Sequence, residues 1–134
     1  AERYRFLTGE GVRSLDIHDV MLDKDCRSDP NSTLKSLRFS RIAGLECDER
    51  LLPSSVERLT FSLTLPERIE LSHCKNLVFI TISGDWESES FLKLLTAPNL
   101  KTIRYLGKKP VSPAVLESLT NRGVTVENGL RFGF

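Results

Sequence analysis

Apolar residues return along this chain at a nearly constant spacing, in the pattern apolar-x-x-apolar-x-apolar. The pattern occurs at Val12-Leu15-Ile17, Leu34-Leu37-Phe39, Val56-Leu59-Phe61, Leu77-Ile80-Ile82 and Leu100-Ile103-Tyr105, with a shorter echo at Val124-Val126. If the middle residue is the marker, the markers are 15, 37, 59, 80, 103 and 124, and the steps are 22, 22, 21, 23 and 21 residues. A period in the low twenties predicts a repeat architecture in which each repeat packs on its neighbours.

Within each repeat, the last two apolar residues are two positions apart, which places both on the same face of an extended strand. The sequence therefore predicts one short strand per repeat, with one face buried. Six parallel strands at about 4.8 Å each make a ladder about 24 Å long. The polar residues between the apolar ones should line up on the opposite face; they are Asp16, Arg38, Thr60, Thr81, Arg104 and Thr125.

One segment, 66–71, also resembles the pattern but comes only about half a repeat after the third marker. A coil with two layers about 10 Å apart needs a perimeter near 40 Å, whereas ten residues reach at most about 36 Å. We therefore expect Ile69 and Leu71 on the return side of the third coil, in a short extended segment that points inward. Leu51 and Leu52 should anchor the preceding return in the same way.

Two return segments have helical signals, both in the C-terminal half. Acidic residues at Glu87 and Glu89 precede the apolar segment 91–95, which favours a helix there. A second helix should begin after Ser112 as N-cap, with Pro113 in its first turn, and end near Gly123. Its expected apolar face is Val115, Leu116 and Leu119. Since a helix is wider than a strand, these helical returns predict stronger curvature toward the C-terminal half.

The first two repeats resemble the leucine-rich repeat, whose strand motif is L-x-x-L-x-L-x-x-N/C-x-L. The matching residues are Val12-Leu15-Ile17-Val20-Leu22 and Leu34-Leu37-Phe39-Ile42. The resemblance covers residues 12–128 and implies an α/β fold: a short solenoid with about six parallel strands on the concave face and mixed loop, strand and helix returns on the convex face. The Asn or Cys of the motif is missing from every repeat, so regular turn geometry is not expected.

The length of 134 residues, with 40% hydrophobic residues, suits a single domain. We divide residues 1–134 into an N-terminal cover at 1–11, about six repeats at 12–128 and a C-terminal tail at 129–134. The open ends of the array need covering, and the candidates are Tyr4, Phe6, Leu7, Leu130, Phe132 and Phe134. The terminal aromatic residues are equally compatible with a piece of a longer array or a larger complex.

A formal charge of +1 provides no strong field for nucleic acid or anionic membrane, and no apolar run is long enough to span a bilayer. Three cysteines without a CxxC pair do not form a disulfide framework, which favours an intracellular compartment, cytoplasmic or nuclear. The sequon at Asn31 keeps the extracellular alternative open. We expect no cofactor and no metal, because Asp23, Asp25 and Asp29 lack the spacing of a calcium loop.

Function in a repeat array usually belongs to the solvent side of its strands. We therefore predict a protein partner on that face, contacted by Asp16, His18, Arg38, Arg41, Arg58, Thr60, Phe79, Thr81 and Arg104. Arg38, Arg58 and Phe79 are the expected centre, because arginine and aromatic residues dominate interface hot spots. The alternative is that these are ordinary solvated strand residues.

We expect no catalysis. His18 and His73 should lie far apart, and neighbouring residues in Ser72-His73-Cys74 should point to opposite faces. One alternative function is nucleic-acid binding by a C-terminal basic cluster of Arg104, Lys108, Lys109 and Arg122.

Another alternative comes from two segments, 72–77 and 97–103, which resemble irregular repeats of the substrate receptors of ubiquitin ligases. Fragments at 52–56 and 74–82 resemble bacterial and protozoan surface repeats instead. Both resemblances are kept as open alternatives.

Overall fold

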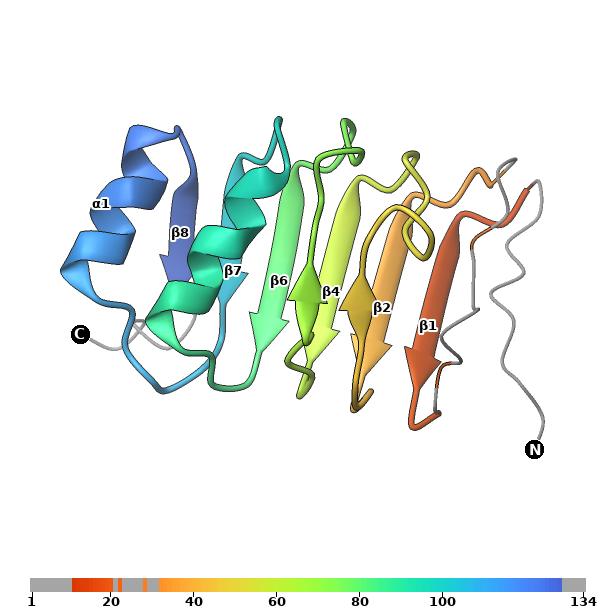
Figure 1. Cartoon of the computed structure of the whole chain (residues 1–134), viewed down its shortest axis with the longest axis horizontal. Coiled ribbons are helices and arrows are strands. Elements are labelled where there is room, and N and C mark those ends of the chain that lie inside the picture. Colours follow the sequence, from red (N-terminus) through yellow and green to blue (C-terminus); the bar gives the residue numbers. More distant parts are fainter. Residues whose placement is uncertain (1–10, 21, 23–27, 29–31, 129–134) are drawn as a thin grey trace.

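The structure is a computed structural model that describes residues 11–20, 22, 28 and 32–128. It is an α/β fold with a six-stranded parallel sheet in the order β1-β2-β4-β6-β7-β8 and a two-stranded sheet of β3 and β5 (Figure 1). The strands are β1 (Ser14–His18), β2 (Ser36–Ser40), β3 (Glu46–Cys47), β4 (Arg58–Ser62), β5 (Arg68–Ile69), β6 (Phe79–Ser83), β7 (Thr102–Tyr105) and β8 (Thr125–Asn128). The helices are the 3-10 helix η1 (Ser88–Thr96) and the α-helix α1 (Pro113–Asn121).

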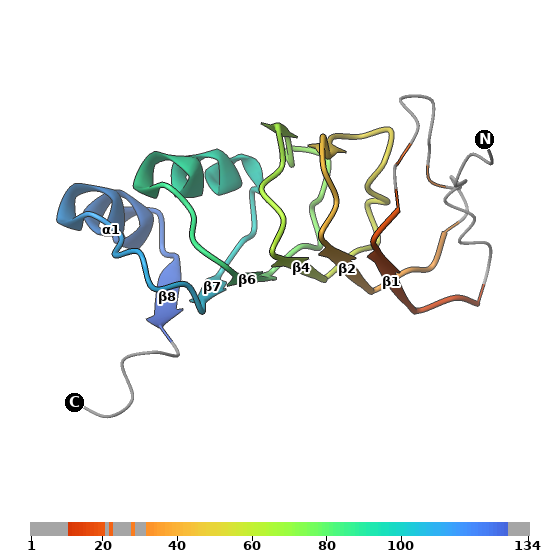
Figure 2. The same cartoon turned by 90° about the horizontal axis from the view of Figure 1, so that it is seen from below.

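The large sheet keeps the order of the chain, and all of its strands run parallel. After each strand the chain therefore crosses back on one side of the sheet before the next strand begins. Figure 2 shows both helices and the small sheet on this return side, in a layer facing the large sheet. The expected α/β class with about six parallel strands is confirmed.

The register confirms the first five markers, because Leu15, Leu37, Leu59, Ile80 and Ile103 pair in sequence across the sheet. The sixth marker is wrong: Ile103 pairs with Val126, and Val124 precedes β8. Gly123, at φ +79°, and Val124 instead close α1 with hydrogen bonds to Thr120 O (2.9 Å) and Leu119 O (2.9 Å). The last step is thus 103 to 126.

The core lies between the large sheet and the returns, and a chain of aromatic rings links the two layers. Neighbouring ring centroids are 6.1 Å apart for Phe39 and Phe61, 5.4 Å for Phe61 and Trp86, and 5.8 Å for Trp86 and Phe91. The last contact, between Phe91 and Tyr105, is 5.0 Å and edge-to-face. Each such pair contributes about 0.5–1.5 kcal/mol beyond its buried area, so these rings tie the helical return to the strands.

The return side agrees with the sequence in most details. Ile69 and Leu71 are buried, and β5 pairs with β3 as a short extended segment. Leu51 and Leu52 are buried as well. The first helical return is a 3-10 helix, η1, and the curvature expected from the helical returns stays a prediction.

The second helix begins as expected, since the Ser112 side chain accepts a hydrogen bond from Val115 N at 3.3 Å. Its apolar face is narrower than predicted. Val115 and Leu119 are buried, but Leu116 is 36% exposed. A helix of 9 residues that packs on one side buries only the residues of its inner stripe.

Polar side chains join neighbouring repeats just before the strands. In each case a side chain donates to a backbone carbonyl about one repeat earlier: Thr33 to Val12 O (3.2 Å), Ser55 to Leu34 O (2.6 Å), Asn76 to Ser54 O (3.1 Å) and Asn99 to Lys75 O (2.7 Å). This ladder was not predicted from the sequence. Its signal is a polar residue immediately before the first apolar residue of a repeat, as in Asn76-Leu77 and Asn99-Leu100.

Several expectations concern residues outside the described ranges. They are the covering residues Tyr4, Phe6 and Leu7, the C-terminal tail at 129–134, the loop carboxylates Asp23, Asp25 and Asp29, and the Asn31 sequon. Within the described ranges, no helix has the length and hydrophobicity that a membrane span requires.

Candidate functional site

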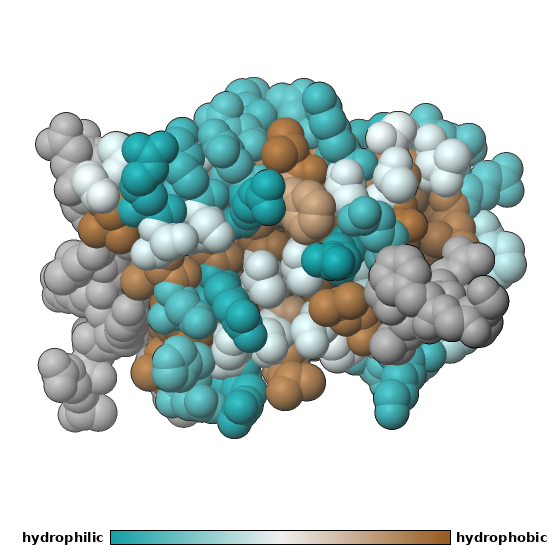
Figure 3. All heavy atoms as spheres, turned by 180° about the vertical axis from the view of Figure 1, so that it is seen from behind, coloured by the Kyte–Doolittle hydropathy of each residue, from teal (hydrophilic) through white to brown (hydrophobic). Residues whose placement is uncertain are grey.

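The face of the large sheet opposite the helices is the candidate site. Strand side chains alternate between the two faces, so the residues that flank the buried ones point away from the core. No described helix or strand lies over this face (Figure 2). Figure 3 views it directly and shows a mixed surface, in which hydrophilic side chains, side chains of intermediate hydropathy and small hydrophobic patches lie next to one another.

The strand register arranges this open face in rows that run across the strands, with neighbours about 4.8 Å apart. The first row is Ser14, Ser36, Arg58, Phe79, Thr102 and Thr125. The second row is Asp16, Arg38, Thr60, Thr81, Arg104 and Glu127. The third row includes His18, Ser40, Ser62 and Ser83. Thr125 was expected in the second row, and Glu127 occupies that place because β8 pairs two residues later than predicted.

Arg58 and Phe79 are neighbours at the centre of the first row. The guanidinium carbon of Arg58 lies 5.3 Å from the centroid of the Phe79 ring, which is a cation–π contact. Among the described residues, the Arg58 side chain has no ion pair. Its hydrogen-bond donors are therefore oriented by the ring and remain accessible to a binding partner.

Arginines nearer the N-terminus are already paired. Arg38 Nε lies 4.0 Å from Asp16 Oδ2 and donates a hydrogen bond to Ser40 Oγ at 3.2 Å. Arg41 lies past the end of β2, with its Nη1 3.8 Å from Asp19 Oδ1. Such exposed pairs contribute only about 0–1 kcal/mol to stability, but they neutralise much of the charge that a partner would meet at this end.

Arg104 differs from Arg38, although both belong to the second row. Its register neighbours are Thr81 and Glu127, and no ion pair of Arg104 is formed within the described ranges. The structure therefore brings together the predicted residues Arg58, Thr60, Phe79, Thr81 and Arg104 on neighbouring strands. It separates Arg41, which lies in the turn beyond its strand.

Two exposed leucines next to this face were not predicted as site residues. Leu63 and Leu65 follow β4 and are 62% and 52% exposed. Leu63 adopts a left-handed backbone, φ +49°, at the position after the strand that Asp19, Arg41 and Gly84 hold in their repeats. The available signal is the sequence Leu63-Thr64-Leu65, which has two apolar residues outside the repeat pattern.

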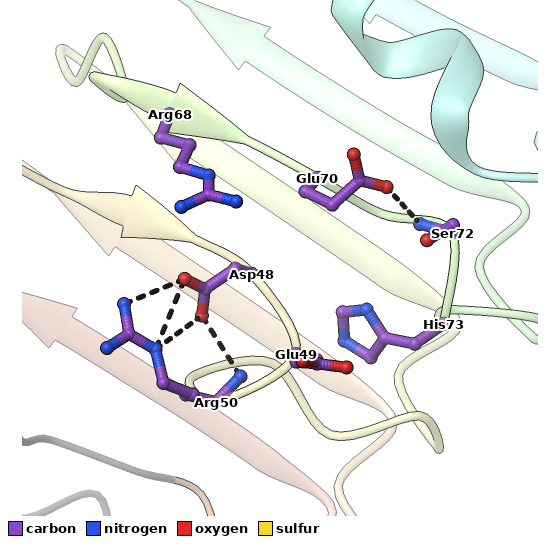
Figure 4. A pocket seen from close by; sticks show the side chains of 7 residues that line it. All are labelled: Asp48, Glu49, Arg50, Arg68, Glu70, Ser72 and His73. Carbon is purple, nitrogen blue, oxygen red and sulfur yellow. Dashed lines mark hydrogen bonds and ion pairs between the residues drawn. The ribbon is translucent and has the colours of Figure 1, made fainter.

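A polar hollow of about 450 Å³ lies on the return side (Figure 4), lined by Asp48, Glu49, Arg50, Arg68, Glu70, Ser72 and His73. Arg50 donates to Asp48 at 2.9 Å, and this hydrogen bond lowers the pKa of the Asp48 carboxyl. Hydrogen bonding to Ser72 lowers the pKa of Glu70. The described residues contain no group of three metal-ligating side chains. The ion pairs of Arg50 with Glu46 and Asp48 lie within one segment that begins at β3.

The expectation that His73 and Cys74 point apart is wrong. Cys74 Sγ lies 3.4 Å from His73 Nε2, which also lies 2.8 Å from Leu52 O. The reason is a turn, closed by the hydrogen bond from Cys74 N to Leu71 O at 2.9 Å, so the alternation of an extended strand does not apply. Burial raises the pKa of Cys74 to about 12, so its thiol stays protonated at neutral pH and is a poor nucleophile.

The C-terminal basic residues have different surroundings: one is in an ion pair, one is bound to a backbone carbonyl and one lies on the open sheet face. The Lys109 ammonium group pairs with the Glu87 carboxylate, which raises the pKa of Lys109. Arg122 donates to Leu95 O at 3.3 Å, and Arg104 belongs to the open sheet face.

Comparison with known proteins found no matching protein family, no similar curated protein and no similar solved structure.

Proposed function

We propose that this chain is a non-catalytic protein–protein interaction module of the leucine-rich-repeat type, which binds a protein partner on the open face of its large sheet. The repeat period and the unbroken parallel register from β1 to β8 support the proposed solenoid. The proposed concave face is the open face, and the returns with η1 and α1 form the convex side.

The observation that carries this proposal is the stack of Arg58 on Phe79 at the centre of a sheet face over which no described helix or strand lies. An aromatic ring that stays partly exposed in a strand, beside a guanidinium that forms no ion pair with any described residue, is the kind of group that concentrates binding energy at interfaces. Hydroxyl side chains surround the pair and offer hydrogen bonds in both directions. An extended and mostly preformed surface of this kind suits a protein better than a small molecule, which needs a concave pocket.

The test is affinity capture from the native source with the wild type and the double variant R38E/R58E. Both side chains are exposed and lie on the open face, so the double variant should fold normally and lose the partner. A control for the individual charge reversal is R68E, which reverses one charge at an exposed arginine on the return side, half of the charge change in the double variant. Unchanged capture by a folded R38E/R58E protein would sink the proposal.

The alternative, nucleic-acid binding, predicts a different salt dependence of binding. Binding to single-stranded DNA should collapse between about 50 and 200 mM salt if phosphate contacts dominate. A partner that is retained at 200 mM salt favours the protein module. If the captured partner belongs to a ubiquitin ligase, the substrate-receptor interpretation gains support.

An intracellular, reducing compartment is part of the proposal. Cys47 and Cys74 are buried free cysteines, which is ordinary in proteins of the cytoplasm or nucleus. Mass spectrometry of the intact protein from its native source, with and without reduction, tests this point through the number of free thiols.

A further inference from the structure

The distribution of paired and unpaired arginines on the open face indicates the charge of the group that the partner presents to it. Arg38 is paired with Asp16 near one end of the second row. Arg58 and Arg104 lack such partners among the described residues. Positive charge is therefore concentrated over β4, β6 and β7, although the chain as a whole is nearly neutral.

Arg58 and Arg104 lie on either side of β6. They are two strands apart, about 10 Å across the sheet, and one row apart, about 7 Å along it, so their backbone positions are separated by about 12 Å. Between them are Phe79, which holds the Arg58 guanidinium, and the Thr81 hydroxyl. The Arg58 guanidinium already leans over Phe79 of β6, and arginine side chains are long enough for both guanidinium groups to reach one carboxylate placed over β6, which accepts charge-assisted hydrogen bonds.

The ends of the second row limit which anion fits. Asp16 is at one end and Glu127 at the other, so carboxylates flank the positive centre on both sides. A continuous polyanion laid across the strands would meet these negative charges. A single acidic side chain over β6, in an otherwise uncharged segment, lies between the two arginines, two strands from Glu127 and three from Asp16.

An apolar contact lies at the other end of the same strands. Leu63 comes five positions after Arg58, which is about 16 Å along β4. It packs beside Gly84 of the next repeat, where a Cβ atom would lie 3.4 Å from its Cδ2. Leu63 and Leu65 together expose an apolar surface at the edge of the open face.

We infer that the partner presents an extended segment along β4 and β6, with an Asp or Glu carboxylate between Arg58 and Arg104 and a large apolar side chain about five residues away, against Leu63 and Leu65. This inference rests on the proposed function and specifies the chemistry of its binding site.

The experiment is selection of binders from a library of random twelve-residue peptides displayed on phage, with the purified chain as bait. We expect selected peptides to be enriched in an Asp or Glu and in a large apolar residue at the stated separation. Synthetic versions of these peptides should bind at least tenfold more weakly to R58E, to R104E and to L63N, and equally well to the return-side control R68E. Asn tolerates the left-handed backbone of Leu63, so L63N tests the side chain rather than the turn.

The outcomes separate this inference from the proposed function. Peptides without acidic residues that still lose binding to R58E would overturn the acidic partner and leave the sheet face as the binding surface. Peptides that bind every face variant like wild type would overturn both. Failure to select any peptide, or tighter binding of single-stranded DNA than of the peptides through Arg58 and Arg104, would also overturn the acidic peptide partner.

Discussion

Replacing Gly107 by alanine should be among the most damaging small substitutions in this chain. A Cβ atom at this position would lie 2.5 Å from Gly84 O and 2.5 Å from both Cε1 and the hydroxyl oxygen of Tyr105. The carbonyl belongs to the backbone of the neighbouring repeat and cannot rotate away. The Tyr105 ring is fully buried and packs edge-to-face on Phe91. Neither neighbour is able to move without disturbing the core.

The expected cost has two parts. Forcing a methyl group into a filled space costs about 1–3 kcal/mol. Displacing the Tyr105 ring also strains its hydrogen bond to Lys109 O, now 2.6 Å, which is worth about 0.5–1.5 kcal/mol. The sum, about 1.5–4.5 kcal/mol, is a large fraction of the 5–15 kcal/mol that stabilises a typical domain. For a chain of 134 residues it corresponds to a fall in Tm of roughly 10 °C.

Urea unfolding followed by circular dichroism measures this free energy. The matched control is G123A, because a Cβ atom added at Gly123 has no other atom within 4 Å. This substitution should lower the free energy of unfolding only by the cost of a left-handed backbone at alanine, about 1 kcal/mol. The variant Y105F removes the hydroxyl group, so the double variant G107A/Y105F should lose less stability than the sum of the two single variants. If G107A unfolds within about 0.5 kcal/mol of wild type, the close packing described here is wrong.

Three further predictions concern the ends and the interior of the fold. S112A should lose about 1 kcal/mol of unfolding free energy, measured by urea titration, because the helix N-cap disappears; an unchanged midpoint would contradict the cap. With Cys26 replaced by serine, Cys47 and Cys74 should resist iodoacetamide in the folded protein and react on unfolding, because burial raises both pKa values; rapid native-state alkylation counts against their burial. Asp85 has a lowered pKa because the backbone N–H groups of Lys109 and Lys108 donate hydrogen bonds to its carboxylate. The stability that this carboxylate contributes to the fold is therefore present above its unfolded pKa of about 3.9 and is lost as the pH falls through its folded pKa. D85N should therefore flatten the acid side of the curve of Tm against pH, and parallel curves for the two proteins would refute this.

The strands were predictable because their side chains obey a strict period of two. Leu37, Leu59 and Ile80 could be placed on one face, in register, from spacing alone. The last strand failed because Val124 and Val126 also alternate, and only the hydrogen bonds that close α1 show that Val124 belongs to the end of the helix. A periodic signal cannot distinguish a strand residue from a buried cap residue two positions earlier.

The returns were less predictable because their structure depends on contacts between repeats. The His73–Cys74 contact follows from a turn that no period describes. The space available at Gly107 is set by Gly84 and Tyr105, one in the preceding repeat and one in the strand before it. These are tertiary constraints, which residue type alone does not reveal.

The candidate site was partly predictable for the same reason as the strands. Alternation assigned Arg58, Phe79 and Arg104 to the solvent side, and the register then made them neighbours. Which arginines are neutralised was not predictable, because the pairing of Arg38 with Asp16 depends on side-chain conformations. Leu63 was missed because it lies outside the repeat pattern.

The two faces of the large sheet separate stability from binding. Residues such as Leu59 and Ile80 are buried on one face and supply the core, whereas Arg58 and Arg104 on the other face are exposed and form no ion pair with a described residue. Surface substitutions away from such contacts usually change stability by no more than about 0.5 kcal/mol. Charge reversal on the open face should therefore alter binding with little effect on folding. A loss of partner by R58E or R104E, in a protein that unfolds at the wild-type midpoint, is consequently attributable to the surface itself.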